Sequence, residues 1–156
     1  QITENDFIVS AYFSYGWMPT ILNLNFQDKK EIEEIVLLLN AVKGGYFLDR
    51  TELHKIKKLI NNSIVGTSKL LHFINPSKYL IWDSRVANYF GIKLPNNVDL
   101  YLQYLSFCHK IDSSVAKEIH SNVALQINCM KEVTEFRALE FVFFNKGLKK
   151  NESTKE

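Results

Sequence analysis

The chain has 156 residues, of which 46% are hydrophobic and 13% are aromatic. This length and composition indicate one folded globular domain and exclude an intrinsically disordered chain. A formal net charge of +2 permits nucleic acid as a partner without requiring it. No apolar run approaches the ~20 residues of a membrane helix, and no signal-peptide pattern opens the sequence. We therefore expect a cytoplasmic protein with no membrane partner.

Hydrophobic residues recur at helical spacing along most of the chain, with no convincing strand pattern and no internal repeat. The sequence therefore predicts an all-α fold, a compact bundle of about seven helices. The expected helices cover residues 4–15, 28–42, 49–60, 83–90, 113–131 and 134–146, with a short helix near 70–74 and another that follows Pro95 and ends near residue 111.

Glycines mark the places where several of these helices are expected to end. Gly16 and Gly147 follow the last apolar positions of their helices, and Gly91 suits the left-handed conformation of a helix C-cap. We expect residues 1–147 to form a single helical domain. The remaining residues, 148–156, are polar and charged and are expected to form a disordered tail.

The two cysteines, Cys108 and Cys129, fall within apolar helical patterns and do not have metal-ligand spacing. We therefore expect buried free thiols without a disulfide. The sequence also lacks a glycine-rich phosphate loop, a Ser-His-Asp order typical of hydrolases, and a carboxylate cluster suited to two metals. We expect no metal and no cofactor.

The stretch from Leu59 to Phe90 carries the strongest functional signal. A Val65-Gly66-Thr67 turn separates a basic amphipathic run from a short apolar run. Such a turn can expose backbone N–H groups at a helix N-terminus, where an anion binds without a side-chain charge. DNA phosphate is one such anion. The same stretch ends in a helix that Asp83 is expected to open.

The segment Ile64-Val65-Gly66, followed by Ile81-Trp82-Asp83-Ser84-Arg85-Val86, resembles the hairpin and catalytic region of the helix-hairpin-helix (HhH-GPD) DNA glycosylase superfamily. The resemblance covers about residues 53–92. It implies a helix-hairpin-helix motif, DNA binding, and hydrolysis of the N-glycosidic bond of a damaged or modified base, with Asp83 as catalytic residue. Ser68 stands where bifunctional members carry a lysine, and Lys69 follows one position later, so the resemblance implies a monofunctional enzyme.

Asp83 suits this chemistry on physical grounds as well. Excision of a base passes through an oxocarbenium-like sugar, and a positioned carboxylate can stabilise that charge or activate water. An aspartate before a helix is also an ordinary N-cap, worth about 1 kcal/mol. The two roles are compatible with each other.

The expected DNA contacts are to the duplex backbone, because main-chain amides and lysine side chains that contact phosphate do not read the edge of a base. For the lysines of the helix after Asp49, a solvated helix face is an equally good interpretation. For Arg85, the alternative is an ion pair with a nearby acid. The expected DNA-binding residues are Lys55, Lys58, Val65, Gly66, Thr67, Ser68, Lys69 and Arg85.

Three aromatic side chains, Trp17, His72 and Trp82, are candidates for a base pocket. Trp17 lies in an aromatic turn that can offer a stacking face, although such large apolar groups commonly plug one end of a helical core. His72 lies among apolar residues and has the pattern of a core histidine. Arg137 is expected in an ion pair at helical spacing, with Glu140 three residues later.

Two other functions are compatible with the sequence. The first is a non-catalytic module that binds the DNA backbone within a repair, phage or defence system. The second is an all-α protein-interaction domain in which the turn at Gly66 is only a turn; the sequence does not identify a protein partner. Whether Asp83 faces a cavity lined by Trp17, Trp82 or His72 would help to distinguish these functions.

Overall fold

The structure is a computed structural model that describes residues 1–127 and 133–152. The prediction of an all-α fold is confirmed, with eight helices and no strand in the described part of the chain. Extended residues pair there only at an isolated bridge between Leu24 and Ile60. The helices are α1 (Glu4–Tyr15), α2 (Lys29–Lys43), α3 (Arg50–Leu59), α4 (Ile64–Ile74), α5 (Ser84–Tyr89), α6 (Val98–His109), α7 (Ser113–Ile127) and α8 (Glu135–Glu152).

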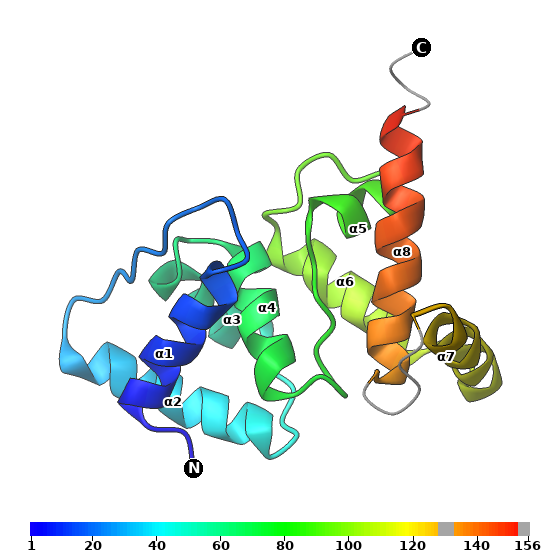
Figure 1. Cartoon of the computed structure of the whole chain (residues 1–156). Helices are drawn as coiled ribbons and strands as arrows, with labels where there is room; N and C mark the ends of the chain where they lie inside the picture. Colours follow the sequence, from blue (N-terminus) through cyan, green and yellow to red (C-terminus); the bar gives the residue numbers. More distant parts are fainter. Residues whose placement is uncertain (128–132, 153–156) are drawn as a thin grey trace.

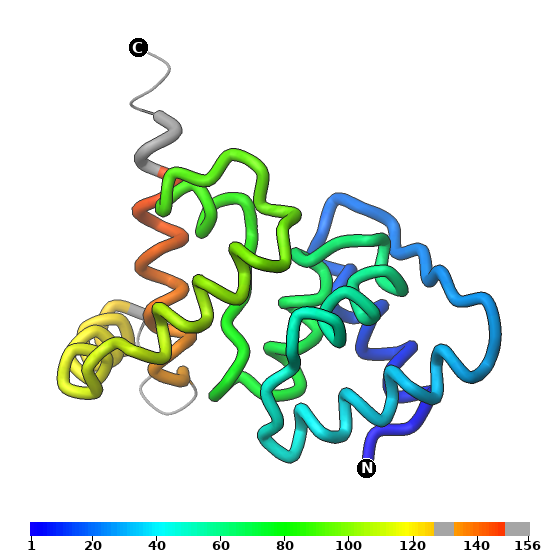
Figure 2. Tube along the Cα trace, turned by 180° about the vertical axis from the view of Figure 1, so that it is seen from behind, coloured from blue at the N-terminus to red at the C-terminus, as the bar shows by residue number. Residues whose placement is uncertain are grey.

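The helices form two groups that lie side by side. Helices α1–α4 make up one group and α5–α8 the other, with an extended connector running from the end of α4 to the start of α5 (Figure 1). Seen from behind, α6 crosses from the middle of the molecule toward α7 (Figure 2). It packs against α3, so it joins the two groups. One continuous hydrophobic core contains side chains of both.

Side-chain caps fix where most of the helices begin. In each case a side-chain oxygen accepts a hydrogen bond from a backbone N–H of the first helical turn, which stabilises the helix by about 1 kcal/mol. At α3, Asp49 and Glu52 form a capping box, in which each side chain accepts a hydrogen bond from the other residue's backbone N–H. The N-cap residues are Thr3, Asp28, Asp49, Ser63, Asp83 and Asn97.

The glycines near helix ends have different roles. Gly16 ends α1 as expected, and Gly91 after α5 has a φ of 76°, the left-handed conformation that was predicted. The expected helix end at Gly147 is wrong, because α8 continues to Glu152. A Cβ atom at position 147 would overlap the carbonyl oxygen of Arg85. This glycine therefore allows α5 and α8 to approach closely.

Several sequence predictions concern the last third of the chain. Cys108 is free and buried, as expected, whereas Cys129 lies outside the described residues. The expected extension of the α7 helix to residue 131 also lies outside them. Residues 148–152, expected in the tail, belong to α8, and residues 153–156 are not described. Within the described chain no helix is long and apolar enough to cross a membrane.

The chain turns between α3 and α4 at Asn61 and Asn62, not at Gly66. Their φ angles of 51° and 49° are left-handed, a conformation that asparagine tolerates better than most residues. The Ser63 hydroxyl then accepts a hydrogen bond from the Gly66 N–H at 3.1 Å. Gly66 therefore lies inside the first turn of α4, and the expected Val65-Gly66-Thr67 turn is wrong.

Gly66 is buried because α1 packs against it at Tyr15. A Cβ atom at position 66 would lie 2.7 Å from the Cε2 atom of the Tyr15 ring. We expect Gly66→Ala to lower the free energy of unfolding by about 1–3 kcal/mol, although alanine is the better helix former. Urea denaturation measures this difference. Gly16→Ala, at an exposed right-handed position, is the control and should change stability by less than about 0.5 kcal/mol. Unchanged stability of Gly66→Ala would show that Tyr15 moves aside at no cost.

Candidate functional site

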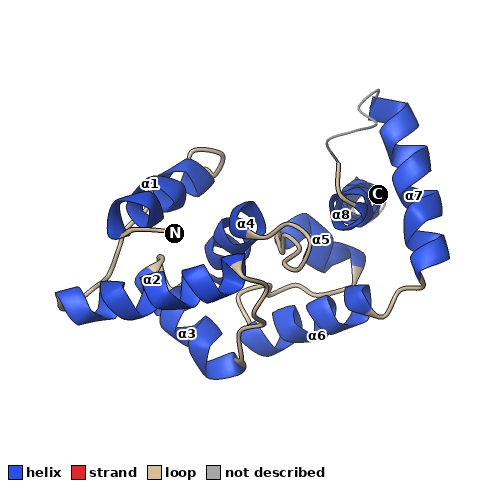
Figure 3. Ribbon diagram, turned by 90° about the horizontal axis from the view of Figure 1, so that it is seen from below, coloured by secondary structure: helices blue, strands red, loops and turns tan. Residues whose placement is uncertain are grey.

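A cavity of about 500 Å³ lies between the two groups of helices. Its volume is in the range typical of small-ligand sites. In the view from below, α1 and α8 stand on opposite sides of α4, and all three helices contribute to its walls (Figure 3). The lining residues are Phe13, Ser14 and Trp17 at the end of α1, Lys69 and Phe73 of α4, Ile81 and Asp83 of the connector, and Arg137, Phe141 and Phe144 of α8.

Aromatic rings form one side of this cavity. The ring centroid of Phe13 lies 5.3 Å from that of Phe73 and 6.5 Å from that of Trp17, and both pairs meet edge to face. Trp17 is 75% exposed, so the interpretation that it plugs the core is wrong. An exposed indole beside two phenyl rings offers a surface on which a planar ligand can stack.

Asp83 lines the cavity and also caps α5. Its Oδ1 atom accepts hydrogen bonds from the N–H groups of Arg85 and Val86, at 2.9 Å and 2.8 Å. Its Oδ2 atom makes no hydrogen bond or ion pair with any residue that the structure describes. The cap therefore orients the carboxylate and leaves one oxygen for a ligand, so the two predicted roles of Asp83 are compatible in the structure.

Lys69 lies on α4 beside this carboxylate. Burial lowers the pKa of Lys69, the charge of Asp83 raises it, and the charge of Arg137 lowers it further. No acidic oxygen in the described chain lies within 4.0 Å of its ammonium group. A half-buried cation without an ion pair is costly unless an anion or water compensates it. Lys69 is thus the predicted DNA-contact residue that the structure places best for binding an anion.

Arg137 and Glu140 form the predicted ion pair on α8, with Arg137 Nη1 donating to Glu140 Oε2 at 2.8 Å. Glu140 is only 1% exposed, and its other oxygen accepts a hydrogen bond from the Ile81 N–H. Burial raises the pKa of Glu140 to about 7. This buried carboxyl group therefore links α8 to the connector that carries Asp83, while Arg137 reaches from it to the cavity.

His72 belongs to the core and not to the cavity wall. Its Nδ1 atom donates to the Tyr79 carbonyl oxygen at 2.7 Å and lies 3.4 Å from Glu140 Oε1. Burial lowers its pKa to about 4, so the ring is neutral near pH 7. The core interpretation of His72 is confirmed, and its predicted place in a base pocket is wrong.

Trp82 is also a core residue, with no exposed surface. Its indole N–H donates to the Pro95 carbonyl oxygen at 2.7 Å, and its ring centroid lies 5.0 Å from that of Tyr104. The Ser68 hydroxyl accepts a hydrogen bond from the Trp82 backbone N–H at 3.0 Å. Trp82 and Ser68 therefore hold the connector against α4 directly before Asp83, and the predicted base-pocket place of Trp82 is wrong.

The main-chain amides predicted to bind phosphate are engaged within the first turn of α4. Gly66, Thr67 and Ser68 are buried, and the Thr67 N–H donates to the Ser63 carbonyl oxygen at 3.0 Å. Val65 is partly exposed and packs against the core. Because the turn occurs earlier in the chain than expected, these amides do not form an open anion site.

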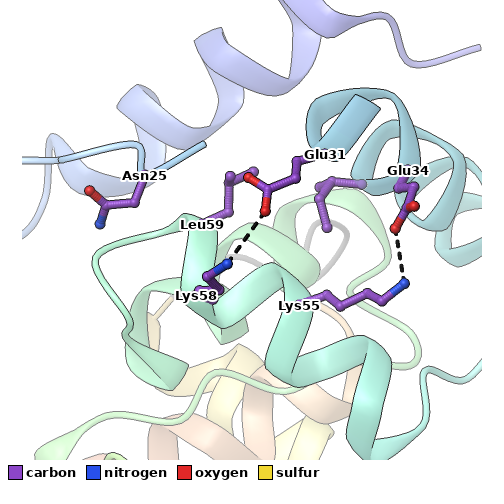
Figure 4. A pocket seen from close by; sticks show the side chains of 7 residues that line it. Asn25, Glu31, Glu34, Lys55, Lys58 and Leu59 are labelled. Carbon is purple, nitrogen blue, oxygen red and sulfur yellow. Dashed lines mark hydrogen bonds and ion pairs between the residues drawn. The ribbon is translucent and has the colours of Figure 1, made fainter. Parts of the chain in front are cut away.

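Lys55 and Lys58 line a second, smaller pocket of about 240 Å³ between α2 and α3. Lys55 Nζ lies 2.9 Å from Glu34 Oε2, and Lys58 Nζ lies 3.4 Å from Glu31 Oε1 (Figure 4). The two glutamates of α2 offset the two lysines, so this pocket offers no net positive charge to a phosphate. Its other lining residues are Asn25, Ile35 and Leu59.

Lys57 and Arg85 have different surroundings. Lys57 of α3 is 9% exposed and donates a hydrogen bond to Asn62 Oδ1 at 3.0 Å. Arg85 is exposed, and its guanidinium carbon lies 4.6 Å from the ring centroid of Phe144, which lines the cavity. Of the two, Arg85 alone stands at the edge of the cavity.

A scan against protein-family models, a search of curated proteins and a search of solved structures found no match to this chain. Among the residues that the structure describes, no group of three or more His, Cys, Asp or Glu side chains is arranged to hold a metal ion.

Glu140 and His72 are buried groups whose pKa values are shifted within the acidic to neutral range, so they predict a specific pH dependence of stability. The folded pKa of Glu140 is raised, so its stabilising contribution is complete below its ordinary pKa of 4.5 and is lost as the pH rises through about 7. The folded pKa of His72 is lowered, so stability falls as the pH drops from 6.5 toward 4. Between about pH 4.5 and 6.5, a rise in pH therefore lowers the free energy of unfolding through Glu140 and raises it through His72.

Above pH 6.5, His72 is neutral in both the folded and the unfolded state, so of these two groups only Glu140 still makes the free energy of unfolding depend on pH. We expect the free energy of unfolding to fall by about 1 kcal/mol between about pH 6.5 and 8, and Glu140→Gln to remove this fall, because a glutamine does not ionise. Urea denaturation at several pH values measures it. A wild-type stability that rises over this range would contradict the raised pKa of Glu140.

Proposed function

We propose that the protein binds DNA and hydrolyses the N-glycosidic bond of a damaged or modified base, with Asp83 as the catalytic residue and without a lyase step. One observation carries this proposal: Asp83 lines a cavity with aromatic walls and keeps one carboxylate oxygen free of its helix cap. A cavity of about 500 Å³ has room for a base extruded from the duplex.

In this mechanism the base leaves the helical stack and lies against Phe13, Trp17 and Phe73. The C1′–N bond breaks, its electron pair stays with the base, and positive charge develops on the sugar. The free Oδ2 atom of Asp83 stabilises that charge and takes a proton from the water that adds to C1′. The departing base takes up a proton from solvent and Asp83 releases the proton that it took, so one water is consumed and the products are a free base and a sugar hydroxyl.

The cations around the cavity support backbone contact. Lys69, Arg85 and Arg137 lie in or beside it, whereas Lys55 and Lys58 are paired with glutamates elsewhere. We therefore assign the phosphate contacts to Lys69, Arg85 and Arg137, and not to the backbone N–H groups of α4.

This placement predicts a measurable dependence on salt. With about three phosphates engaged, the logarithm of the DNA association constant should fall with the logarithm of salt concentration at a slope of about −3. Fluorescence anisotropy with a labelled duplex measures the slope. Lys69→Met should make it shallower by about one unit, and Lys55→Met should leave it unchanged. Equal slopes for these two variants would remove Lys69 from the DNA contact.

The activity itself is tested on duplexes that each contain one alkylated, deaminated or oxidised base. Mass spectrometry detects the free base, and hot alkali reveals the abasic site as a strand break. We expect release from at least one of these substrates, with no strand break before alkali is added. Breaks without alkali would contradict the monofunctional mechanism.

A non-catalytic module that binds the DNA backbone is the second candidate. The observation that favours it is the hydrogen bonding of Asp83 Oδ1, which accounts for this residue as a helix cap without any chemistry. Salt-dependent DNA binding together with no base release from any substrate would establish this function in place of the first.

A further inference from the structure

Two cationic side chains, Lys69 and Arg137, line the cavity. Lys69 has no ion pair or hydrogen bond with any described residue, and it is half-buried. Arg137 donates one hydrogen bond to Glu140 through Nη1, which leaves its other nitrogens for further contacts. The guanidinium group is held in place by a carboxyl group that is itself buried.

The charges that line the cavity sum to an excess of one positive charge. Lys69 and Arg137 contribute two positive charges, and the carboxylate of Asp83 contributes one negative charge. Glu140 is not part of the lining, but its ion pair with Arg137 offsets part of the positive charge of that residue. An anion that entered the cavity would therefore meet a favourable field, and it would also compensate the burial that lowers the pKa of Lys69.

Apart from Ser14 and Ile81, the other residues of the lining are aromatic. Phe13, Phe73 and Trp17 lie at one end, and Phe141 and Phe144 belong to α8, the helix that also carries Arg137. A ligand that satisfies both parts of the cavity combines a planar ring with an anionic group. A nucleotide has this combination, whereas inorganic phosphate and a nucleoside each have only half of it.

We propose that Lys69 and Arg137 form an anion subsite that binds the phosphate of the same nucleotide whose base stacks on the aromatic side of the cavity. This inference rests on the proposed function in taking a base as the stacking group, but it does not require that the base be released. Arg137 offers a planar fork to the phosphate oxygens, and Lys69 offers a single point charge. The ligand is a nucleoside monophosphate unit, either free or within a DNA strand.

The test compares each of the four deoxynucleoside 5′-monophosphates with its own nucleoside and with inorganic phosphate, by isothermal titration calorimetry. We expect at least one nucleotide to bind about 10- to 100-fold more tightly than the matching nucleoside, the gain typical of hydrogen bonds to charged groups. Lys69→Met should remove most of this difference without weakening nucleoside binding. Lys69→Arg keeps the charge and should retain the difference.

Lys55→Met is the matched control, because this lysine is paired with Glu34 in the smaller pocket. It should leave every affinity unchanged. Arg137→Lys keeps a charge but loses the planar fork, and we expect it to weaken nucleotide binding by about tenfold. The proposal is overturned if no nucleotide binds the wild type more tightly than its nucleoside, or if Lys69→Met and Lys55→Met behave alike.

A single-stranded oligonucleotide distinguishes the two sources of the nucleotide. If it binds more tightly than the free nucleotide and depends equally on Lys69, the site takes a nucleotide within a strand. If only the free nucleotide depends on Lys69, the site takes a small molecule. Binding of nucleotides without base release from any duplex would contradict the glycosylase function and leave this subsite standing.

Discussion

Replacement of Asp83 with asparagine is expected to lower the rate of base release about 100-fold or more while the protein stays folded. Asparagine caps a helix about as well as aspartate, and its Oδ1 atom can accept the same two hydrogen bonds from Arg85 and Val86. Loss of the charge near the α5 N-terminus should cost at most about 1 kcal/mol. A neutral amide cannot form an ion pair with the sugar cation or take a proton from water.

The matched control for this variant is Asp28→Asn. Asp28 caps α2 in the same manner, by accepting a hydrogen bond from the Glu31 N–H, and it does not line the cavity. Both variants should melt within a few degrees of the wild type, and Asp28→Asn should release base at the wild-type rate. Equal release by Asp83→Asn from a substrate that the wild type processes would rule out the catalytic role and leave Asp83 as a cap.

The fold was largely predictable because its main signals are local. Capping residues such as Asp49 and Asp83 and the helical spacing of apolar residues identify where helices start and which face is buried. The errors concern glycines. Gly66 and Gly147 are required by close approach of another helix, at Tyr15 and at Arg85 respectively. A glycine that allows two helices to pack has the same local sequence signal as a glycine that ends a helix.

The candidate site was predictable only in part. Asp83 stands in a recognisable segment, but the opposite walls of the cavity come from α1 and α8, which lie far away in the sequence. For Phe13 the sequence did contain a signal, because this aromatic residue does not belong to the apolar stripe of α1. Its side chain is 55% exposed. For Arg137, the pairing with Glu140 was foreseen, but no local pattern indicates that Arg137 also reaches a cavity beside Asp83.

The two tryptophans show why composition alone does not place a base pocket. Trp17 and Trp82 were equivalent candidates from the sequence, yet their side chains are at opposite extremes of exposure, 75% and 0%. The α1 helix ends at Gly16, directly before Trp17, so the chain leaves the helical core there. Trp82 follows Ile81, whose backbone is held by Glu140, and its own backbone is held by Ser68.

The same substitution should therefore have opposite consequences at these two positions. Trp82→Ala is expected to lower the free energy of unfolding by about 3–5 kcal/mol, because it empties a fully buried site and leaves the Pro95 carbonyl oxygen without its indole donor. Such a loss is a large fraction of the stability of a domain of this size. Urea denaturation measures the difference, and Trp82→Phe should recover part of it by refilling the site.

Trp17→Ala is the control for this loss and a test of the cavity at the same time. Its stability should stay within about 0.5 kcal/mol of the wild type, since the side chain is mostly exposed. Its affinity for DNA with an extruded base should fall about 5- to 100-fold, the contribution of one base stacked on an aromatic ring.

If Trp17→Ala destabilised the protein as much as Trp82→Ala, Trp17 would be a core residue and the aromatic side of the cavity would lose its stacking face. If Trp17→Ala left both stability and DNA affinity unchanged, the base would have to stack on Phe13 and Phe73 alone.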